Sequence, residues 1–114
     1  MVDDMATDNE HVADYLNEVG RLPRLSPGDE RQELLRAAEG DHDARKRVIE
    51  GNLEVAARLA LRLAPTWMRA LDAIQEANLV LVRLVVDGVG GQPADRLSDE
   101  LVSHYAEVSR RLGL

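Results

Sequence analysis

The sequence predicts an all-α protein, a compact bundle of five or six helices joined by short connections. Three observations lead to this prediction. Apolar residues recur at spacings of three and four along most of the chain, which is the period of an amphipathic helix. Glycine and proline gather between these stretches, and the one Asp-Gly pair, Asp87-Gly88, ends a helical stretch instead of joining two alternating ones. With 114 residues, 45% hydrophobic and 3% aromatic, the chain can form one largely aliphatic core.

Residues 1–7 are acidic and have little apolar surface to bury, so we expect a disordered tail there and a single domain over residues 8–114. The first helix is expected from Asn9 to Val19, with Asp8 as its N-cap and Gly20 as a left-handed stop. Its apolar face comprises Val12, Tyr15, Leu16 and Val19.

The connector that follows leads to a strong helix start at Ser26-Pro27, with Asp29 in capping-box position. A serine hydroxyl can accept a bond from a first-turn amide, and proline has no amide to leave unsatisfied. The second helix is expected to reach about Glu39, to end at Gly40 and to turn three side chains inward, namely Leu34, Leu35 and Ala38.

Two helices are expected between residues 41 and 65. Asp41 can cap a short one, and another is expected to start or continue at Asn52 and to stop before Pro65. A fifth helix is predicted over about residues 68–86. Gly88 to Pro93 then mark a loop, and a last helix is predicted over about residues 94–112.

Charge and composition restrict the function classes. The net charge is −7, and residues 1–20 hold six acids and no Lys or Arg. A chain without a basic stripe is a poor candidate for binding DNA alone, although a larger complex could supply the positive charge. The absence of Cys excludes disulfides, thiolate chemistry and Cys-ligated metals. No apolar run suits a membrane span and no signal peptide is recognisable, so we expect a soluble cytoplasmic protein.

Candidate catalytic and metal-binding residues are few, and we expect no enzyme, metal or cofactor. Asp41-His42-Asp43 is typical of a capped helix start, and His11 and His104 lack a second ligand at helical spacing. No nucleophile motif or phosphate loop is present. Tyr15 is expected at the edge of the core, and Trp67 as a packing wedge between helices.

The most informative stretch is Leu71–Leu79. Asp72, Gln75 and Glu76 share a helix face, Asn78 lies within the same two turns, and Leu79 and Val82 border the cluster. A polar cluster ringed by apolar residues suits docking against a helix that carries Arg or Lys. An ordinary solvated helix face is the alternative.

Three segments of the chain resemble the N-terminal half of the major, housekeeping-type family of bacterial RNA polymerase sigma factors. Residues 12–20 with Pro23 and Leu25-Ser26 are similar to a Tyr-Leu-x-x-Ile-Gly helix and a Pro-x-Leu-Thr connector. Residues 39–53 resemble a Gly-Asp-x-x-Ala-Arg-x-x-Leu-Ile-x-x-Asn-Leu run, and residues 71–78 resemble Leu-Asp-Leu-Ile-Gln-Glu-Gly-Asn. The resemblance covers residues 8–87 in order and at matching spacing.

The resemblance implies a partner, core RNA polymerase, whose largest subunit offers a coiled-coil clamp. It implies that Asp72, Gln75, Glu76 and Asn78 are the polar contacts. The implied apolar contacts are Leu53, Leu71 and Val82. Carboxylates and amides can pair with clamp arginines while apolar neighbours exclude water.

The last helix, residues 94–112, resembles the family less. The family has a Phe-Ser-Thr-Tyr-Ala-x-Trp-Trp-Ile-Arg helix that opens the promoter, and Val108-Ser109 stand here in place of the Trp pair. The resemblance implies weak DNA contacts at Tyr105, Arg110 and Arg111. The alternatives are a core-edge position for Tyr105 and, for the two arginines, a charge pair favoured by the helix dipole. Losing two stacking residues should weaken strand opening.

The leading hypothesis is therefore a sigma-factor-like protein that binds core RNA polymerase and meets promoter DNA only within that complex, if at all. The second is a helical interaction module that has lost polymerase and DNA binding, with an anti-sigma-type protein or another copy of itself as partner. A DNA-binding module acting alone is a third hypothesis, which the charge and the missing Trp pair disfavour.

Overall fold

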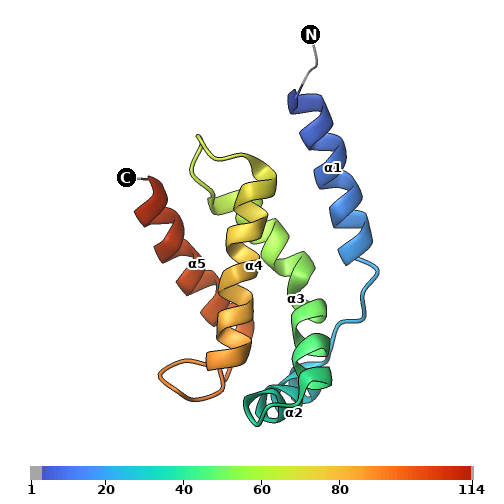
Figure 1. Cartoon of the computed structure of the whole chain (residues 1–114), viewed down its shortest axis with the longest axis vertical. Coiled ribbons are helices and arrows are strands. Elements are labelled where there is room, and N and C mark those ends of the chain that lie inside the picture. The colour runs from blue at the N-terminus through green and yellow to red at the C-terminus, as the bar shows by residue number, and fades with distance from the viewer. Residues whose placement is uncertain (1–3, 114) are drawn as a thin grey trace.

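The computed structural model describes the backbone of residues 4–113 and the side chains of residues 8–113. Within that range the chain forms five helices, and its only β-type pairing is an isolated bridge between Val89 and Gln92. The helices are α1 (Asp4–Val19), α2 (Pro27–Ala38), α3 (His42–Leu63), α4 (Ala70–Asp87) and α5 (Leu97–Gly113). The all-α prediction is confirmed (Figure 1).

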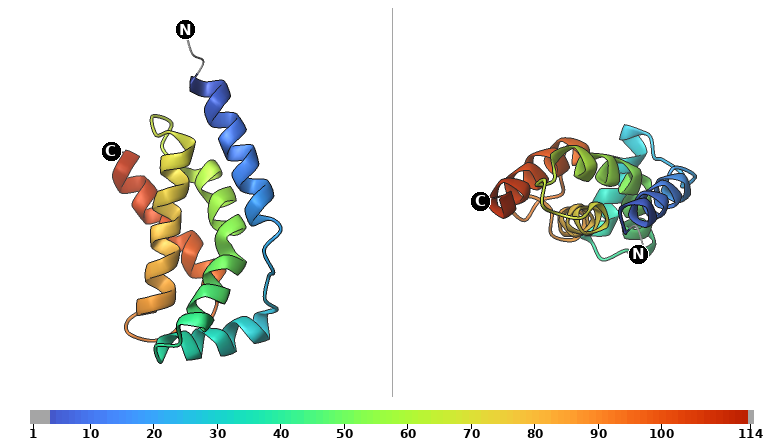
Figure 2. Two further views of the ribbon diagram at one scale, coloured as in Figure 1. Left: turned by 45° about the vertical axis from the view of Figure 1, so that its right-hand side comes forward. Right: turned by 90° about the horizontal axis from the view of Figure 1, so that it is seen from above.

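The centre of the bundle is the pair α3 and α4, which share the most extensive helix–helix interface. α2 crosses one end of this pair, α5 packs on α4 and α3, and α1 lies along the opposite edge from α5 (Figures 1 and 2). The result is flattened, with extents of 50 × 33 × 19 Å. One broad side of α4 is consequently left without a covering helix.

Small residues make the close α3–α4 packing possible. Four alanines of α3 and two of α4 are completely buried: Ala44, Ala56, Ala57, Ala60, Ala73 and Ala77. Larger side chains then fill the space toward α5, with Leu81, Leu101 and Tyr105 at most 1% exposed. An interior this tightly packed is sensitive to the loss of even a few methylene groups.

α1 begins earlier than predicted. Its backbone is helical from Asp4, so the expected tail over residues 1–7 overlaps its first turn, and residues 1–3 lie outside the described range. Asp8 is not an N-cap, because it lies inside the helix, and its carboxylate accepts hydrogen bonds from the Arg69 guanidinium at 2.7–3.0 Å. Gly20 is not left-handed either. A Cβ there would lie 3.0 Å from the backbone carbonyl oxygen of Leu16 and 3.1 Å from a carboxylate oxygen of Glu54, so the space for a side chain is small.

α2 starts as predicted, with the Ser26 hydroxyl accepting a hydrogen bond from the amide of Asp29 at 3.2 Å. It is followed by the left-handed Gly40, at φ +97°. Its buried side chains are Leu34 and Ala37. Leu35 is 51% exposed and Ala38 is exposed as well, so these two parts of the predicted inner face are wrong. Each lies one residue, about 100° of helix turn, away from the buried stripe.

The predicted third and fourth helices are one continuous helix, α3, which starts after Asp41. The Asp41 side chain accepts a hydrogen bond from the Ala44 amide at 3.1 Å, as expected of a cap. Gly51 does not interrupt the helix, since it gives room for the connector: a Cβ there would lie 3.3 Å from the Pro23 carbonyl oxygen. The next residue, Asn52, is buried, and its amide donates to the Val48 carbonyl at 2.8 Å and to Glu30 at 3.1 Å.

The loop after α4 contains the predicted glycines. Gly88 caps the helix at φ +71°, and a Cβ there would lie 2.0 Å from the Gln92 carbonyl oxygen. Gly90 and Gly91 are also left-handed, at φ +58° and +82°, which is the geometry of a tight turn. α5 then begins at Leu97, three residues later than predicted.

Candidate functional site

The uncovered side of α4 carries a straight row of exposed side chains, which we call the α4 face: Asp72, Gln75, Leu79, Val82 and Val86. The alternating spacing of three and four residues places them on one side of the helix. Leu79 is 50% exposed, although Val80 and Leu81 beside it are buried. The row is polar at the start of the helix and apolar toward its end.

The two polar members of the α4 face are unengaged within the monomer. Neither the Asp72 nor the Gln75 side chain makes a hydrogen bond or an ion pair with any residue in the described part of the chain. A carboxylate and an amide held side by side on a rigid helix can accept bonds from a guanidinium or an ammonium group. These side chains are therefore free to meet a basic partner.

The other two predicted polar contacts point elsewhere. Glu76 is half-buried, and its charge acts on Tyr105 of α5. Asn78 donates a hydrogen bond to the Tyr15 hydroxyl of α1 at 3.1 Å, and its own amide oxygen is buried without a partner among the described residues. The expected single cluster is thus divided: Asp72 and Gln75 face solvent, whereas Asn78 is engaged with α1.

The predicted apolar contacts are also separated. Val82 is 39% exposed and belongs to the α4 face. Leu71 and Leu53 are half-buried and pack against the core, so each offers only part of its surface to a partner. Val86, which is 38% exposed, completes the row and was not among the predicted contacts. Extending the three-and-four spacing beyond Val82 would have identified it.

The three predicted weak DNA contacts lie in different environments: Tyr105 is buried in the core, whereas Arg110 and Arg111 are exposed at the end of α5. Tyr105 is 1% exposed, and burial, with a smaller effect from Glu76, raises the pKa of its hydroxyl. A ring buried to this extent has no face on which a base can stack in this structure, and it lies inside the core, deeper than the core-edge position that was the alternative. Arg110 and Arg111 lie in the last turn of α5, and both form ion pairs with Glu107.

Ser109 of α5 has a structural role in this chain. The hydroxyl of Ser109 is buried and donates a hydrogen bond to the carbonyl oxygen of Leu63, in the last turn of α3. Because the last carbonyls of a helix lack an intrahelical partner, this bond satisfies one of them. The second half of α5 is thereby held against the bundle.

Trp67 is not the predicted packing wedge, because it is 64% exposed. It lies on the link between α3 and α4, beside a shallow cleft of about 300 Å³ that Asp8 and Arg69 also line. Local sequence patterns carry no signal of this exposure, since it depends on how the first half of α1 lies beside the link.

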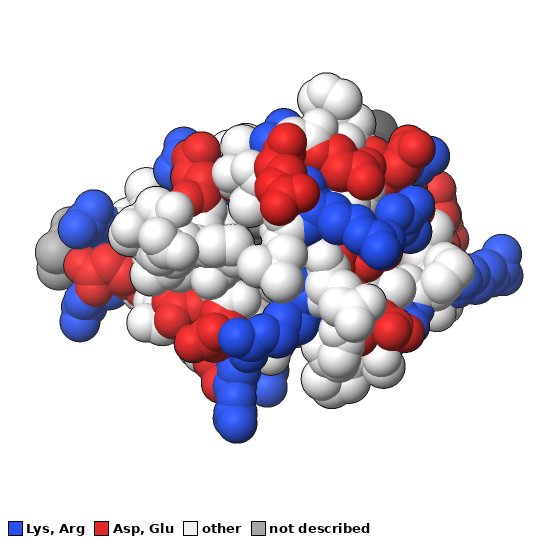
Figure 3. All heavy atoms as spheres, turned by 90° about the horizontal axis from the view of Figure 1, so that it is seen from below, with Lys and Arg blue, Asp and Glu red and all other residues white. Residues whose placement is uncertain are grey.

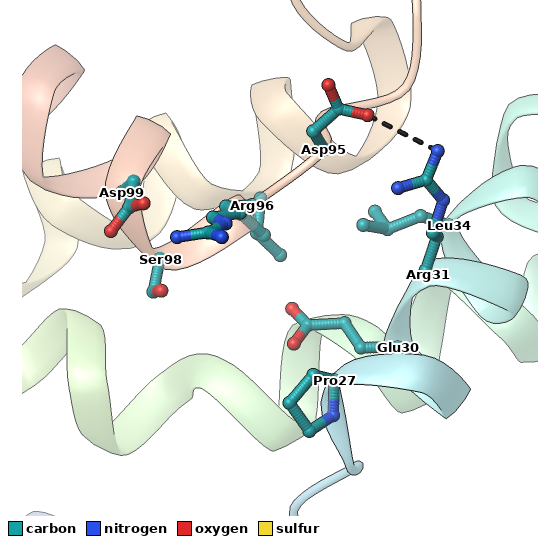
Figure 4. A pocket seen from close by; sticks show the side chains of 9 residues that line it. Pro27, Glu30, Arg31, Leu34, Asp95, Arg96, Ser98 and Asp99 are labelled. Carbon is teal, nitrogen blue, oxygen red and sulfur yellow. Dashed lines mark ion pairs between the residues drawn. The ribbon is translucent and has the colours of Figure 1, made fainter.

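A cleft of about 410 Å³ opens between the first turns of α2 and α5, and sequence reasoning did not anticipate it. Arg31 reaches across its mouth to Asp95 at 3.5 Å, while Glu30, Arg96 and Asp99 lie around it (Figure 4). At this end of the molecule acidic and basic side chains are interspersed (Figure 3). Such a surface has no single-sign field to attract a polyanion.

Within residues 8–113 no group of three His, Asp or Glu side chains is placed to hold a metal ion. His104 pairs with Glu100 at 3.2 Å, and His11 is exposed. The Ala44 amide holds the pKa of Asp41 below its usual range, as its capping role requires. None of the described helices is both long and apolar enough to cross a membrane.

Comparison with known proteins supplies the family context. No family model matches the chain. It is 40% identical over 77 residues to RNA polymerase sigma factor SigA of a Bacillus species, a match that covers 68% of this chain and 20% of the relative. It is 42% identical over 71 residues to SigA of Clostridium acetobutylicum, covering 62% and 19%. The chain thus spans about a fifth of these relatives, and the predicted resemblance is confirmed.

Proposed function

We propose that this sigma-factor-like chain acts in transcription initiation or its regulation by binding core RNA polymerase, and that the α4 face contacts the clamp of the largest subunit. The observation that supports the proposal most directly is the exposure of the α4 face. Its two polar side chains have no partner among the described residues, and three large apolar side chains beside them remain exposed. Both relatives are named as RNA polymerase sigma factors.

The order of residues along the α4 face suggests how each half would contribute. Asp72 and Gln75 would accept charge-assisted hydrogen bonds from basic side chains and so fix the register of the partner. Leu79, Val82 and Val86 would lose their contact with water, which supplies most of the affinity in a docking patch of this kind. Glu76 and Leu71 would contribute at the margins, since each is already half-buried.

We further propose that promoter opening by this chain is weak. Tyr105 is enclosed in the core, and Ser109 is bonded to α3 where the family has a stacking Trp. Base stacking on an aromatic ring is worth about 1–3 kcal/mol per base. With a net charge of −7, contact with DNA would depend on the positive charge of the polymerase.

Binding to purified core RNA polymerase tests the proposal. Asp72→Arg and Gln75→Ala change the free polar end of the α4 face. Asp72→Arg, which reverses a charge, should weaken binding at least tenfold. Gln75→Ala, which is neutral, should weaken it severalfold. Gln32→Ala is the matched control, because Gln32 is an exposed glutamine on α2. If both α4 variants bind as tightly as wild type, the docking assignment is wrong.

The apolar half of the α4 face also suits a second function, a protein–protein module that pairs with an anti-sigma-type protein or with another copy of the chain. Leu79, Val82 and Val86 have the spacing of a helix–helix seam. Light scattering of the chain alone, and then with polymerase, separates the two functions. A stable dimer that does not bind polymerase would favour the module.

A further inference from the structure

α1 is attached to the bundle more weakly than the other helices. It has the least extensive contacts with α3 and α4, and Val19 is its only fully buried side chain in the described range. Its acidic residues Asp14 and Glu18 lie in the half where the helix dipole disfavours negative charge, and its last turn holds no basic residue. The beginning of α1 also extends past the link between α3 and α4 (Figure 1).

Two polar contacts hold the outer part of α1 against the molecule, beside the partly buried side chains of Val12 and Tyr15, which pack against the core. Asp8 forms its paired bonds with Arg69, just before α4 begins, and Tyr15 accepts the hydrogen bond from Asn78. The second contact is incomplete, since the Asn78 oxygen is buried without a partner among the described residues. If the amide were turned over, its nitrogen would lose its partner instead. The docked position of α1 therefore leaves a polar group unsatisfied that opening would hydrate.

We infer that α1 is a movable strap over the edge of the α4 face, and that its release frees Asn78 for a docking partner. The strap pivots where Val19 is buried and where the connector crosses α3 at Gly51. In the docked position the available surface is the α4 face alone. In the released position the Asn78 amide joins it, one turn from Gln75 along the same helix.

The inference rests on the proposed function and makes α1 a regulator of the same surface. A partner that binds only the released form sees an affinity reduced by the fraction of molecules in that form. Any change that loosens α1 without touching α4 should consequently tighten binding, whereas loss of a rigid structural contact would weaken it or leave it unchanged.

Hydrogen exchange on the intact chain, alone and saturated with core polymerase, tests the movement directly. In the free chain, amides of residues 8–18 should exchange faster than those of α3 and α4, as a separate opening unit. On binding, α1 should exchange faster still, while α4 becomes protected. Equal protection of α1 and α3 in the free chain, or slower exchange of α1 in the complex, overturns the inference.

A pair of matched variants tests the effect on affinity. Asp8→Asn weakens the bond to Arg69, and Glu10→Gln makes the same chemical change on an exposed α1 residue that has no partner among the described residues. Asp8→Asn should tighten polymerase binding about two- to fivefold, the range set by the strength of an exposed ion pair. Glu10→Gln should leave it unchanged. Equal affinities for Asp8→Asn and wild type overturn the strap.

The two proposals fail in different ways. If neither wild type nor Asp8→Asn binds polymerase, the proposed function is overturned, and exchange of α1 in the free chain still shows whether the strap opens. If wild type binds and α1 exchange is unchanged by the complex, docking on α4 stands and the strap is overturned.

Discussion

Two leucines two positions apart on α4 separate a role in docking from a role in folding. Leu79 is 50% exposed on the α4 face, whereas Leu81 is completely buried between the helices. Leu81→Ala leaves a cavity in a tightly packed interior, which should cost about 3 kcal/mol of unfolding free energy. At roughly 4 °C per kcal/mol for a domain of this size, the melting temperature should fall by about 12 °C.

Leu79→Ala should have the opposite profile. Half of its surface is already in water, so the stability loss should be at most about 1 kcal/mol, about 4 °C or less. Loss of the exposed half from an interface removes a similar amount from binding, about 1 kcal/mol, which is roughly a fivefold weaker Kd.

Thermal unfolding by circular dichroism and titration of core polymerase are measured on wild type and both variants. They give the change in melting temperature and the change in Kd for each variant. Binding is measured at 20 °C, where both variants remain folded. If Leu79→Ala lowers the melting temperature as much as Leu81→Ala does, the α4 face is part of the fold. If it binds polymerase like wild type, Leu79 does not contact the partner.

Three further predictions concern the framework. Gly51→Ala should destabilise the chain by about 1 kcal/mol in urea unfolding because the Pro23 carbonyl is in the way, whereas Gly28→Ala, which meets nothing, should be neutral or stabilising. The capping bond lowers the pKa of Asp41, so its contribution to the free energy of unfolding is present above the unfolded-state pKa and disappears as pH falls through the folded-state pKa. In Asp41→Asn, the free energy of unfolding should therefore depend less on pH between pH 5 and pH 2. Burial raises the pKa of Tyr105, so stability should fall as pH rises above about 10, less so in Tyr105→Phe, and equal alkaline curves would contradict this.

Local signals predicted much of the helical framework. Ser26 and Asp41 accept capping bonds where the sequence places helix starts, and Gly40 and Gly88 adopt the left-handed conformations expected at helix ends. Each of these depends on residues within four positions of one another. The expectation of two helices between residues 41 and 65 was wrong, because α3 runs through Asn52 without a break. Gly51 within it leaves room for a connector that lies more than twenty residues earlier.

The candidate site was predicted only in part, because local spacing carries no information about contacts between distant parts of the chain. Helical spacing identifies which side chains of α4 share a direction, and it places Asp72 and Gln75 together. It cannot show that Asn78 faces Tyr15, 63 residues away, or that Arg69 is joined to Asp8, 61 residues away. Both contacts depend on the position of α1, which is set by packing and by the path of the connector.

The exposure of Trp67 gives the chain a built-in optical probe. It is the only indole in the sequence and lies beside the cleft where Asp8 meets Arg69. A water-exposed indole emits at long wavelength already in the native fold, so its emission wavelength changes little when the protein unfolds. Its accessibility to a neutral quencher instead depends on the neighbouring end of α1. Fluorescence of the unlabelled protein therefore reports on the contact between α1 and the α3–α4 link, and it is insensitive to changes in the core.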